Sequence, residues 1–319
     1  MTIRDFSPAD DALHPPSDKH AWTETSWWSF NVPERALGGW LYVQVRPHQN
    51  STAGGAFVWD AEASLPWELP FFAWFTHQKL PEGLDLRAAR LPSGVEITQV
   101  EPGMVYDLGY RFRDETDFRA DLRFTGIIPP FPYPAGVPPF SASSHFDQPG
   151  HVTGRITLRG ETIDVDCYAV RDRSWGPRPE HWGRTGRLSY AFGTVDQQTA
   201  FLVFCAPSSA DPFTDIEAVM TGYLLRDGVT GRLVSGIRTS RRDPADGMVR
   251  AIALSLVDEL GRRAEIHGES LSRMALPRHR VTFNSLMRWD WDGQECFGED
   301  QDLWPVALTA DRRRRQTGD

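Results

Sequence analysis

The chain has 319 residues, of which 40% are hydrophobic, so it is long enough to bury one large core or two ordinary ones. A formal net charge of −9 argues against nucleic-acid binding, which needs clustered Lys and Arg side chains. The 12 Trp, 18 Phe and 7 Tyr must line either a core or an apolar cavity, because each ring buries a large area.

The start of the chain contains no apolar stretch of the kind that a signal peptide needs, and we predict that residues 1–20 form a flexible N-terminal segment. No later segment approaches the ~18 uninterrupted apolar residues of a membrane helix. The cysteines Cys167, Cys205 and Cys296 are too widely spaced for a disulfide framework or a Cys-x-x-Cys metal site. We therefore predict a cytoplasmic protein without a membrane span.

Short segments in which polar and apolar residues alternate follow one another along the chain, separated by Gly, Pro, Asp and Asn turn signals. We find no long amphipathic helix between them, and parallel strands would need such crossover helices. The pattern therefore predicts an all-β protein built from antiparallel sandwiches or barrels. The predicted strands are residues 39–46, 55–59, 71–77, 94–100, 104–113, 118–126, 151–159, 161–170, 188–195, 200–205, 218–226, 232–240, 248–257, 263–268 and 281–291.

A proline-rich stretch at residues 128–140 separates two sets of strands. Its prolines cannot donate hydrogen bonds to a strand ladder, which predicts a linker or rim loop. We place a domain boundary close behind it, with one β domain at residues 21–148 and a second at residues 149–310. The remaining residues 311–319 carry a run of arginines and are predicted to be a basic, disordered tail.

The segment from Tyr168 to Arg178 contains an acidic residue, Asp172, between Arg171 and Arg173. Strand alternation places Asp172 on the face opposite both arginines, together with Asp166, Tyr168, Val170 and Ser174. In an apolar pocket, a carboxyl group in this position would have a raised pKa and could act as a general acid near neutral pH. A bulge at Arg171 would exchange the two faces. The alternative is that Asp172 pairs with an arginine and fixes the end of the strand.

Aromatic residues cluster near the start of the chain and again at residues 71–75. Their rings could line a pocket for a flat or polyene-like ligand and stabilise a developing carbocation, although ordinary core packing explains the same residues. The candidate substrate-binding residues are Trp28, Trp59, Trp74, Tyr168 and Trp175.

Two histidines are candidates for relaying protons to Asp172. His145 follows the proline-rich stretch, together with Asp147 and His151, and His77 ends an aromatic strand. The spacing of His145 and His151 is not that of a metal site, so we predict no metal. Gly-x-Ser-x-Gly and glycine-rich phosphate loops are also missing from the sequence, and we predict no organic cofactor.

The sequence from His145 to Gly160, followed by the sequence from Asp166 to Arg178, resembles a superfamily of tandem lipocalin-like proteins. This superfamily includes the carotenoid 1,2-hydratase (hydroxyneurosporene synthase) family, AttH-like proteins and many uncharacterised bacterial members, to which the match is closest. The resemblance implies two antiparallel β-barrel or calyx domains packed together, with an apolar cavity near their junction. Asp172 matches the acidic position of the motif and Trp175 its tryptophan, whereas Arg173 stands where many relatives have histidine.

Characterised members of the superfamily act on hydrophobic, often isoprenoid-derived molecules by hydration, cyclisation or cycloaddition, without a metal or an organic cofactor. The resemblance therefore implies a cofactor-independent lyase or isomerase, of hydratase or cyclase type, in which Asp172 protonates an isoprenoid- or steroid-like substrate. The alternative is a non-catalytic lipocalin-like carrier of a hydrophobic small molecule, in which Asp172 and Trp175 are structural. The enzyme, unlike the carrier, needs Asp172 to lack a two-pronged arginine partner. A third function, as an interaction protein, would require several Trp side chains on the surface.

Overall fold

The computed structural model describes residues 6–113, 117–178, 186–277 and 280–317. The chain separates into two compact units. Unit 1 comprises Met1–Trp59 and Leu69–Pro179, and unit 2 comprises Asp60–Glu68 and Glu180–Asp319. The predicted all-β class is confirmed, because strands form both units and α1 (Val306–Thr317) is the one α-helix of the described part.

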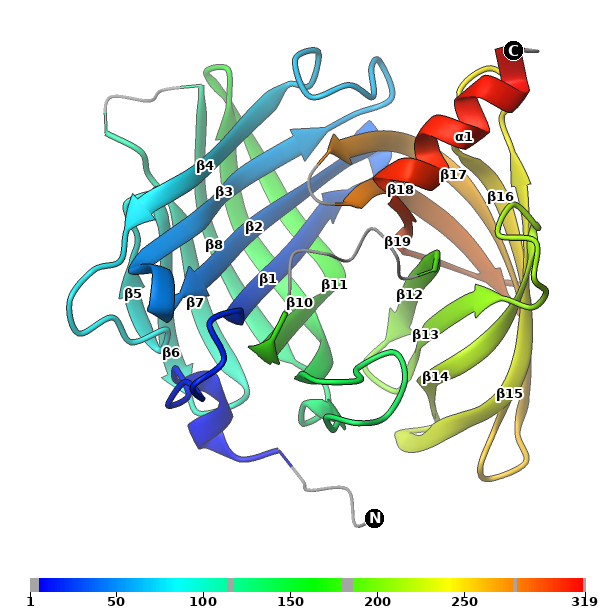
Figure 1. Ribbon diagram of the computed structural model, residues 1–319, viewed down its shortest axis with the longest axis horizontal. Coiled ribbons are helices and arrows are strands. Elements are labelled where there is room, and N and C mark those ends of the chain that lie inside the picture. The colour runs from blue at the N-terminus through cyan, green and yellow to red at the C-terminus, as the bar shows by residue number, and fades with distance from the viewer. Residues whose placement is uncertain (1–5, 114–116, 179–185, 278–279, 318–319) are drawn as a thin grey trace. The chain divides into compact units, whose positions relative to one another are not determined.

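Unit 1 is built on one antiparallel sheet of 11 strands, drawn from blue to green in Figure 1. The strand order is β4-β3-β2-β1-β11-β10-β8-β7-β6-β5, and β9 pairs with β10 outside this path. The strands are β1 (Trp22–Val32), β2 (Leu37–Arg46), β3 (Ser51–Trp59), β4 (Phe71–Lys79), β5 (Ala88–Arg90), β6 (Val95–Glu101), β7 (Val105–Tyr110), β8 (Phe118–Gly126), β9 (Phe131–Tyr133), β10 (Ser144–Leu158) and β11 (Glu161–Pro177). The short 3-10 helices η1 (Pro8–Asp11), η2 (Pro33–Arg35) and η3 (Pro47–Gln49) precede β1, β2 and β3.

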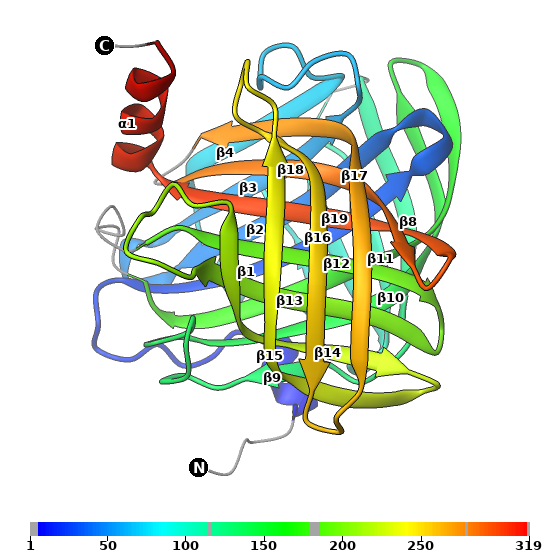
Figure 2. The same cartoon turned by 90° about the vertical axis from the view of Figure 1, so that its right-hand side faces the viewer.

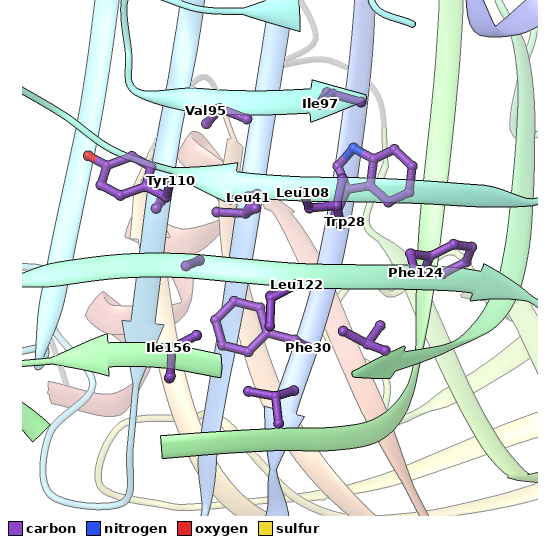
Figure 3. Packing of buried hydrophobic residues seen from close by; sticks show 14 of the residues in the cluster. Trp28, Phe30, Leu41, Val95, Ile97, Leu108, Tyr110, Leu122, Phe124 and Ile156 are labelled. Atoms are coloured by element: carbon purple, nitrogen blue, oxygen red, sulfur yellow. The ribbon is translucent and has the colours of Figure 1, made fainter. Parts of the chain in front are cut away.

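The core of unit 1 lies inside the curl of this sheet. Leu41 of β2 and Ile97 of β6 belong to one buried cluster, although these strands are far apart along the sheet, so the sheet rolls around the cluster. Figure 3 shows rings and aliphatic side chains from both ends of the sheet packed together, including Trp28, Phe30 and Phe124. Because alternate residues of β1 and β11 point inward, this core uses one face of each strand and leaves the other face for a second set of side chains.

Unit 2 contains a closed antiparallel barrel of eight strands, seen from its side in Figure 2. Each strand pairs with the next along the chain, and the last pairs with the first. The strands are β12 (Leu188–Asp196), β13 (Thr199–Pro207), β14 (Ile216–Arg226), β15 (Val229–Arg242), β16 (Val249–Asp258), β17 (Arg263–Pro277), β18 (Arg280–Trp291) and β19 (Gln294–Pro305). Closure removes the unpaired edges that an open sheet would expose. None of the described helices is long and apolar enough to cross a membrane.

The predicted domain boundary at residue 148 is wrong. β10 and β11 pair with β8 and β1, so residues 149–177 belong to the first unit. The prolines at residues 128–140 misled the prediction, because they frame the short strand β9 along β10 rather than a linker between domains.

Both ends of the chain are also more ordered than predicted. Within the segment expected to be flexible, η1 contains Asp10 and Asp11, which are 3% and 4% exposed. Most of the predicted disordered tail continues α1, where Arg312 lies over the ring of Trp304. Composition alone did not show this order, because it does not say which residues pack against each other.

Candidate functional site

The candidate site is positioned by the hairpin of β10 and β11, at the centre of the unit 1 sheet (Figure 1). The two turn residues, Arg159 and Gly160, both have positive φ, as a two-residue type I′ turn requires. The resulting register pairs Asp147 with Asp172. It also pairs His145 with Ser174. Directly paired residues point to the same face of a sheet, so these four side chains gather on one face.

His145 connects two members of this group. Its Nε2 lies 3.1 Å from Oδ1 of Asp147, and its Nδ1 lies 2.7 Å from Oγ of Ser174. Because the carboxylate can only accept, this arrangement favours the proton on Nε2 and a hydroxyl that donates to Nδ1. The imidazole also stacks on Phe140, with ring centroids 4.4 Å apart. His145 and Asp147 are buried, so the orientation of this pair is fixed from several sides.

One oxygen of the Asp172 carboxyl group is unsatisfied among the described residues. Its Oδ1 is buried and has no hydrogen-bond partner among the described residues, although the side chain as a whole is partly exposed. The pKa of Asp172 is raised to about 6. Burial is the largest cause and the neighbouring carboxylate of Asp147 acts in the same direction, whereas His145, Arg178 and Arg173 lower the pKa. A carboxyl group with such a pKa can both give and take a proton near neutral pH.

The two arginines that flank Asp172 point to the opposite face of β11, as strand alternation predicts. Arg171 stands opposite Trp28 of β1 and lies over the ring of Tyr106, 4.3 Å from its centroid. Arg173 forms an ion pair with Glu24. No ion pair of the described residues joins either arginine to Asp172.

The same cluster is the one place in the described part of the chain where three metal-ligating side chains converge. The ligand atoms of His145, Asp147 and Asp172 all lie within 4.8 Å of one another. However, Nε2 of His145 faces a carboxylate and Nδ1 faces a hydroxyl, so its lone pair is engaged or replaced by a proton. These contacts fit a hydrogen-bonded proton site better than a preformed metal site.

Three of the predicted site residues lie away from Asp172. His77 is exposed on β4, four strands from β11, which corresponds to about 19 Å along the sheet. Trp28 is part of the core on the opposite face, and Trp175 stacks on His14 on that same face, with ring centroids 4.2 Å apart. The prediction treated nearness in sequence and aromatic character as nearness in space, and the two-residue period of a strand separates these side chains.

The other predicted aromatic residues share the face of Asp172. Tyr168 lies four residues before it on β11, and the paired residues of β1, β2, β3 and β4 carry the same face across the sheet to Trp59 and Trp74. Along this row the rings contact one another, edge to face between Trp40 and Trp59 at 5.6 Å and stacked between Phe57 and Trp74 at 5.8 Å. The structure therefore places an aromatic row beside the carboxyl cluster.

Two residues next to Asp172 were not among the predicted site residues. Trp27 pairs with Asp172 from β1 and is 2% exposed, and Ser174 holds the imidazole of His145. The sequence pattern that could have revealed Ser174 is the alternation of side chains along a strand. His145-x-Asp147 and Asp172-x-Ser174 occupy matching positions on the two strands of one hairpin, so their side chains share a face.

A half-barrel sheet and a closed barrel in one chain, each with a buried core, define a tandem lipocalin-like protein. The chain belongs to the family described as "Domain of unknown function (DUF7064)", whose model matches residues 7–301. A search of curated proteins found no match.

Solved structures of the same fold are similar over nearly the whole chain. An AttH-like protein from Nitrosomonas europaea has 17% identity and a TM-score of 0.53, covering 89% of this chain and 92% of its own. Kievitone hydratase from Nectria haematococca has 9% identity and a TM-score of 0.54, with 95% and 94% covered. CghA has 12% identity and a TM-score of 0.54, with 95% and 97% covered. At these identities the likeness shows the fold, and it confirms the resemblance to AttH-like proteins found in the sequence.

Proposed function

We propose that this protein is a cofactor-independent lyase or isomerase, of hydratase or cyclase type, that acts on a hydrophobic substrate with Asp172 as its general acid and base. The observation that carries the proposal is the buried Oδ1 of Asp172, which has no hydrogen-bond partner among the described residues. With a pKa of about 6, about a tenth of the Asp172 side chains would hold a proton at pH 7. A purely structural carboxyl group would instead be paired with an arginine, and both flanking arginines have other partners.

The chemistry is a proton transfer in two directions. Asp172 gives its proton to an alkene carbon or a leaving hydroxyl, and the resulting cation develops on the face that Trp27 occupies, where a ring can stabilise it. The cation then takes up water or loses a neighbouring proton, and the released proton returns to the Asp172 carboxylate. His145 holds Asp147 and Ser174 in place beside the acid, so the charge next to Asp172 stays fixed through the cycle.

Two of the structural relatives support a small-molecule substrate. One is named as a kievitone hydratase, and CghA has a second structure with Sch210972, which covers 93% of this chain with a TM-score of 0.52. The aromatic row on the face of Asp172 agrees with a hydrophobic partner, because such rings bind apolar molecules through large contact areas. The carrier hypothesis shares this feature, so the carboxyl group decides between the two.

The test compares wild type with Asp172→Asn in turnover of a panel of terpenoid, polyene and steroid alkenes, with products followed by mass spectrometry. We expect a product with added water or a rearranged skeleton, formed 10²–10⁴-fold more slowly by the variant. Asp166→Asn is a matched control, because Asp166 lies on the same face of the same strand but is exposed and paired with His151. Full turnover by Asp172→Asn would refute the mechanism, and an unchanged molecule retained by both proteins would favour a carrier.

A further inference from the structure

The two arginines beside Asp172 are among the most buried charged groups of unit 1. Arg171 is 1% exposed and Arg173 is 2% exposed, so each brings a guanidinium cation into the interior. Buried cations require compensation, because an uncompensated charge in the interior is strongly unfavourable. Here the compensating carboxylates lie outside the hairpin of β10 and β11 that carries Asp172.

One source is the N-terminal strap, by which we mean residues 7–14. Asp11 in this strap accepts from Nη1 of Arg171 at 2.8 Å, and the backbone oxygen of Ala12 accepts from Nη2 of Arg173 at 2.8 Å. The second source is Glu24 at the start of β1, whose Oε2 lies 2.9 Å from Nη2 of Arg173. Each arginine therefore has one carboxylate of its own.

Several further contacts hold these carboxylates in place. Asp11 accepts hydrogen bonds from the hydroxyl of Tyr106 and from Nε2 of Gln99. The backbone N–H of His14 donates to Oε1 of Glu24 at 2.7 Å, which ties the strap to β1. Because Asp11 and Glu24 are 4% and 1% exposed, water screens their interactions with the arginines only weakly.

We propose that Asp11 and Glu24 are positioning residues. They neutralise Arg171 and Arg173 on the face of β11 opposite Asp172 and thereby keep Asp172 able to hold a proton. This role rests on the proposed function only in assigning the working proton to Asp172. Without the two carboxylates, the arginines would act on the adjacent carboxyl group as free cations. Arg173 already lowers the pKa of Asp172 across the strand. An arginine that has lost its own carboxylate partner would lower that pKa further.

The remaining charged groups around Asp172 within the described part of unit 1 do not supply this balance. β10 contributes His145 and Asp147, and Arg178 directly follows the end of β11. β1 places the uncharged residues Trp27 and Thr25 on this face. Arg171 and Arg173, on the reverse face, are therefore the cations whose effect on the pKa of Asp172 depends on Asp11 and Glu24.

Arg171 also links the strap to the geometry of the cluster. Its Nε donates to Oε1 of Gln148 at 2.5 Å, and these two residues are paired directly across β10 and β11. The next pair along the hairpin is Asp147 with Asp172, on the other face. An anchored pair on one face fixes the register, and therefore the spacing, of the carboxyl pair beside it.

The test measures the titration of Asp172 directly, by carbon NMR of protein labelled at the aspartate carboxyl carbon, with Asp172→Asn used to assign the signal. In Glu24→Gln we expect the midpoint of Asp172 to fall, by up to about one pH unit, and in Asp11→Asn to fall in the same direction. In Arg173→Met we expect it to rise, because Glu24 is then the uncompensated charge. Asp107→Asn is the control, because it breaks an exposed pair of the same unit and leaves the midpoint unchanged.

The opposite signs separate this role from simple loosening of the structure. Water entering a loosened site would lower the midpoint in every variant, including Arg173→Met. The double variant Glu24→Gln/Arg173→Met should return the midpoint towards that of wild type. An unchanged midpoint in folded Glu24→Gln, or a fall in Arg173→Met, would overturn the proposal. Turnover is not needed for this measurement, so it can succeed when the proposed reaction fails and fail when that reaction is found.

Discussion

Replacing Asp172 with asparagine should make the protein more stable above pH 6, even though it removes the proposed acid. The pKa of Asp172 is raised from 3.8 to about 6 in the folded protein, mainly by burial. A raised carboxyl pKa means that the favourable contribution is complete below the unfolded value of 3.8 and is lost as the pH rises through about 6. Wild type therefore carries an unfavourable ionised group at pH 8, and Asp172→Asn does not.

The size of the effect follows from the same shift. A rise from 3.8 to about 6 corresponds to about 3 kcal/mol of lost stability once the group is fully ionised. Part of the side chain reaches solvent, which screens the charge and reduces this value to about 1–2 kcal/mol. Between pH 5 and pH 8, the stability advantage of the variant over wild type should grow by about 1 kcal/mol.

Urea unfolding at several pH values measures this difference, with fluorescence of the tryptophans in unit 1 and unit 2 followed together. Using the change with pH removes the constant penalty of placing an amide where a carboxyl was. Asp164→Asn serves as the control, because Asp164 is an exposed carboxylate on the same face of the same strand and is paired with an arginine, Arg155, and not with a histidine. If the stability difference between Asp172→Asn and wild type stays flat from pH 5 to pH 8, the carboxyl group is not held at a raised pKa and the reasoning fails.

Two further predictions concern unit 2. Arg238→Met should lower the stability of this unit by about 3–5 kcal/mol in thermal unfolding, because Asp300 loses the three hydrogen bonds that Arg238 donates within a fully buried ion pair; a change below 1 kcal/mol would contradict this. Gly268→Ala should destabilise it by about 1–3 kcal/mol, since the added Cβ would lie 2.3 Å from the ring of Trp289, whereas Gly186→Ala, with no atom within 4 Å, should have no such effect; equal unfolding temperatures would show that the ring can move aside.

The pairing of the two site carboxyls could have been predicted from the sequence. Residues 151–159 and 161–170 were predicted as neighbouring strands with Gly160 alone between them. Because a hairpin needs at least two turn residues, Arg159 and Gly160 are the turn, and Leu158 pairs with Glu161. If the same register continues along both strands, each step back from Leu158 is matched by one step forward from Glu161, which brings Asp147 opposite Asp172. The predicted domain boundary at residue 148 cut the hairpin and hid this consequence.

The compensation of the arginines could not have been predicted in the same way. Asp11 and Arg171 are separated by 160 positions in the chain, and nothing in the composition of residues 1–20 distinguishes a docked strap from a flexible one. Strand alternation correctly placed Asp172 on the face away from Arg171 and Arg173. The aromatic site residues, in contrast, were predicted only from their being aromatic. Strand pairing across β1 to β4, which local patterns do not reveal, decides which rings share the face of Asp172.

The position of the carboxyl pair is itself an argument for function. Two carboxyl groups directly opposite each other on paired strands repel when both are ionised, so cross-strand pairing disfavours them. This pair lies at the centre of an 11-stranded sheet, held by β1 on one side and β8 on the other, where a neutral or apolar pair would be more stable. The same hairpin satisfies its reverse face with the pair Gln148 and Arg171. An unfavourable pair kept in the most constrained part of the unit, with its flanking charges neutralised, is what a site that must hold and release a proton requires.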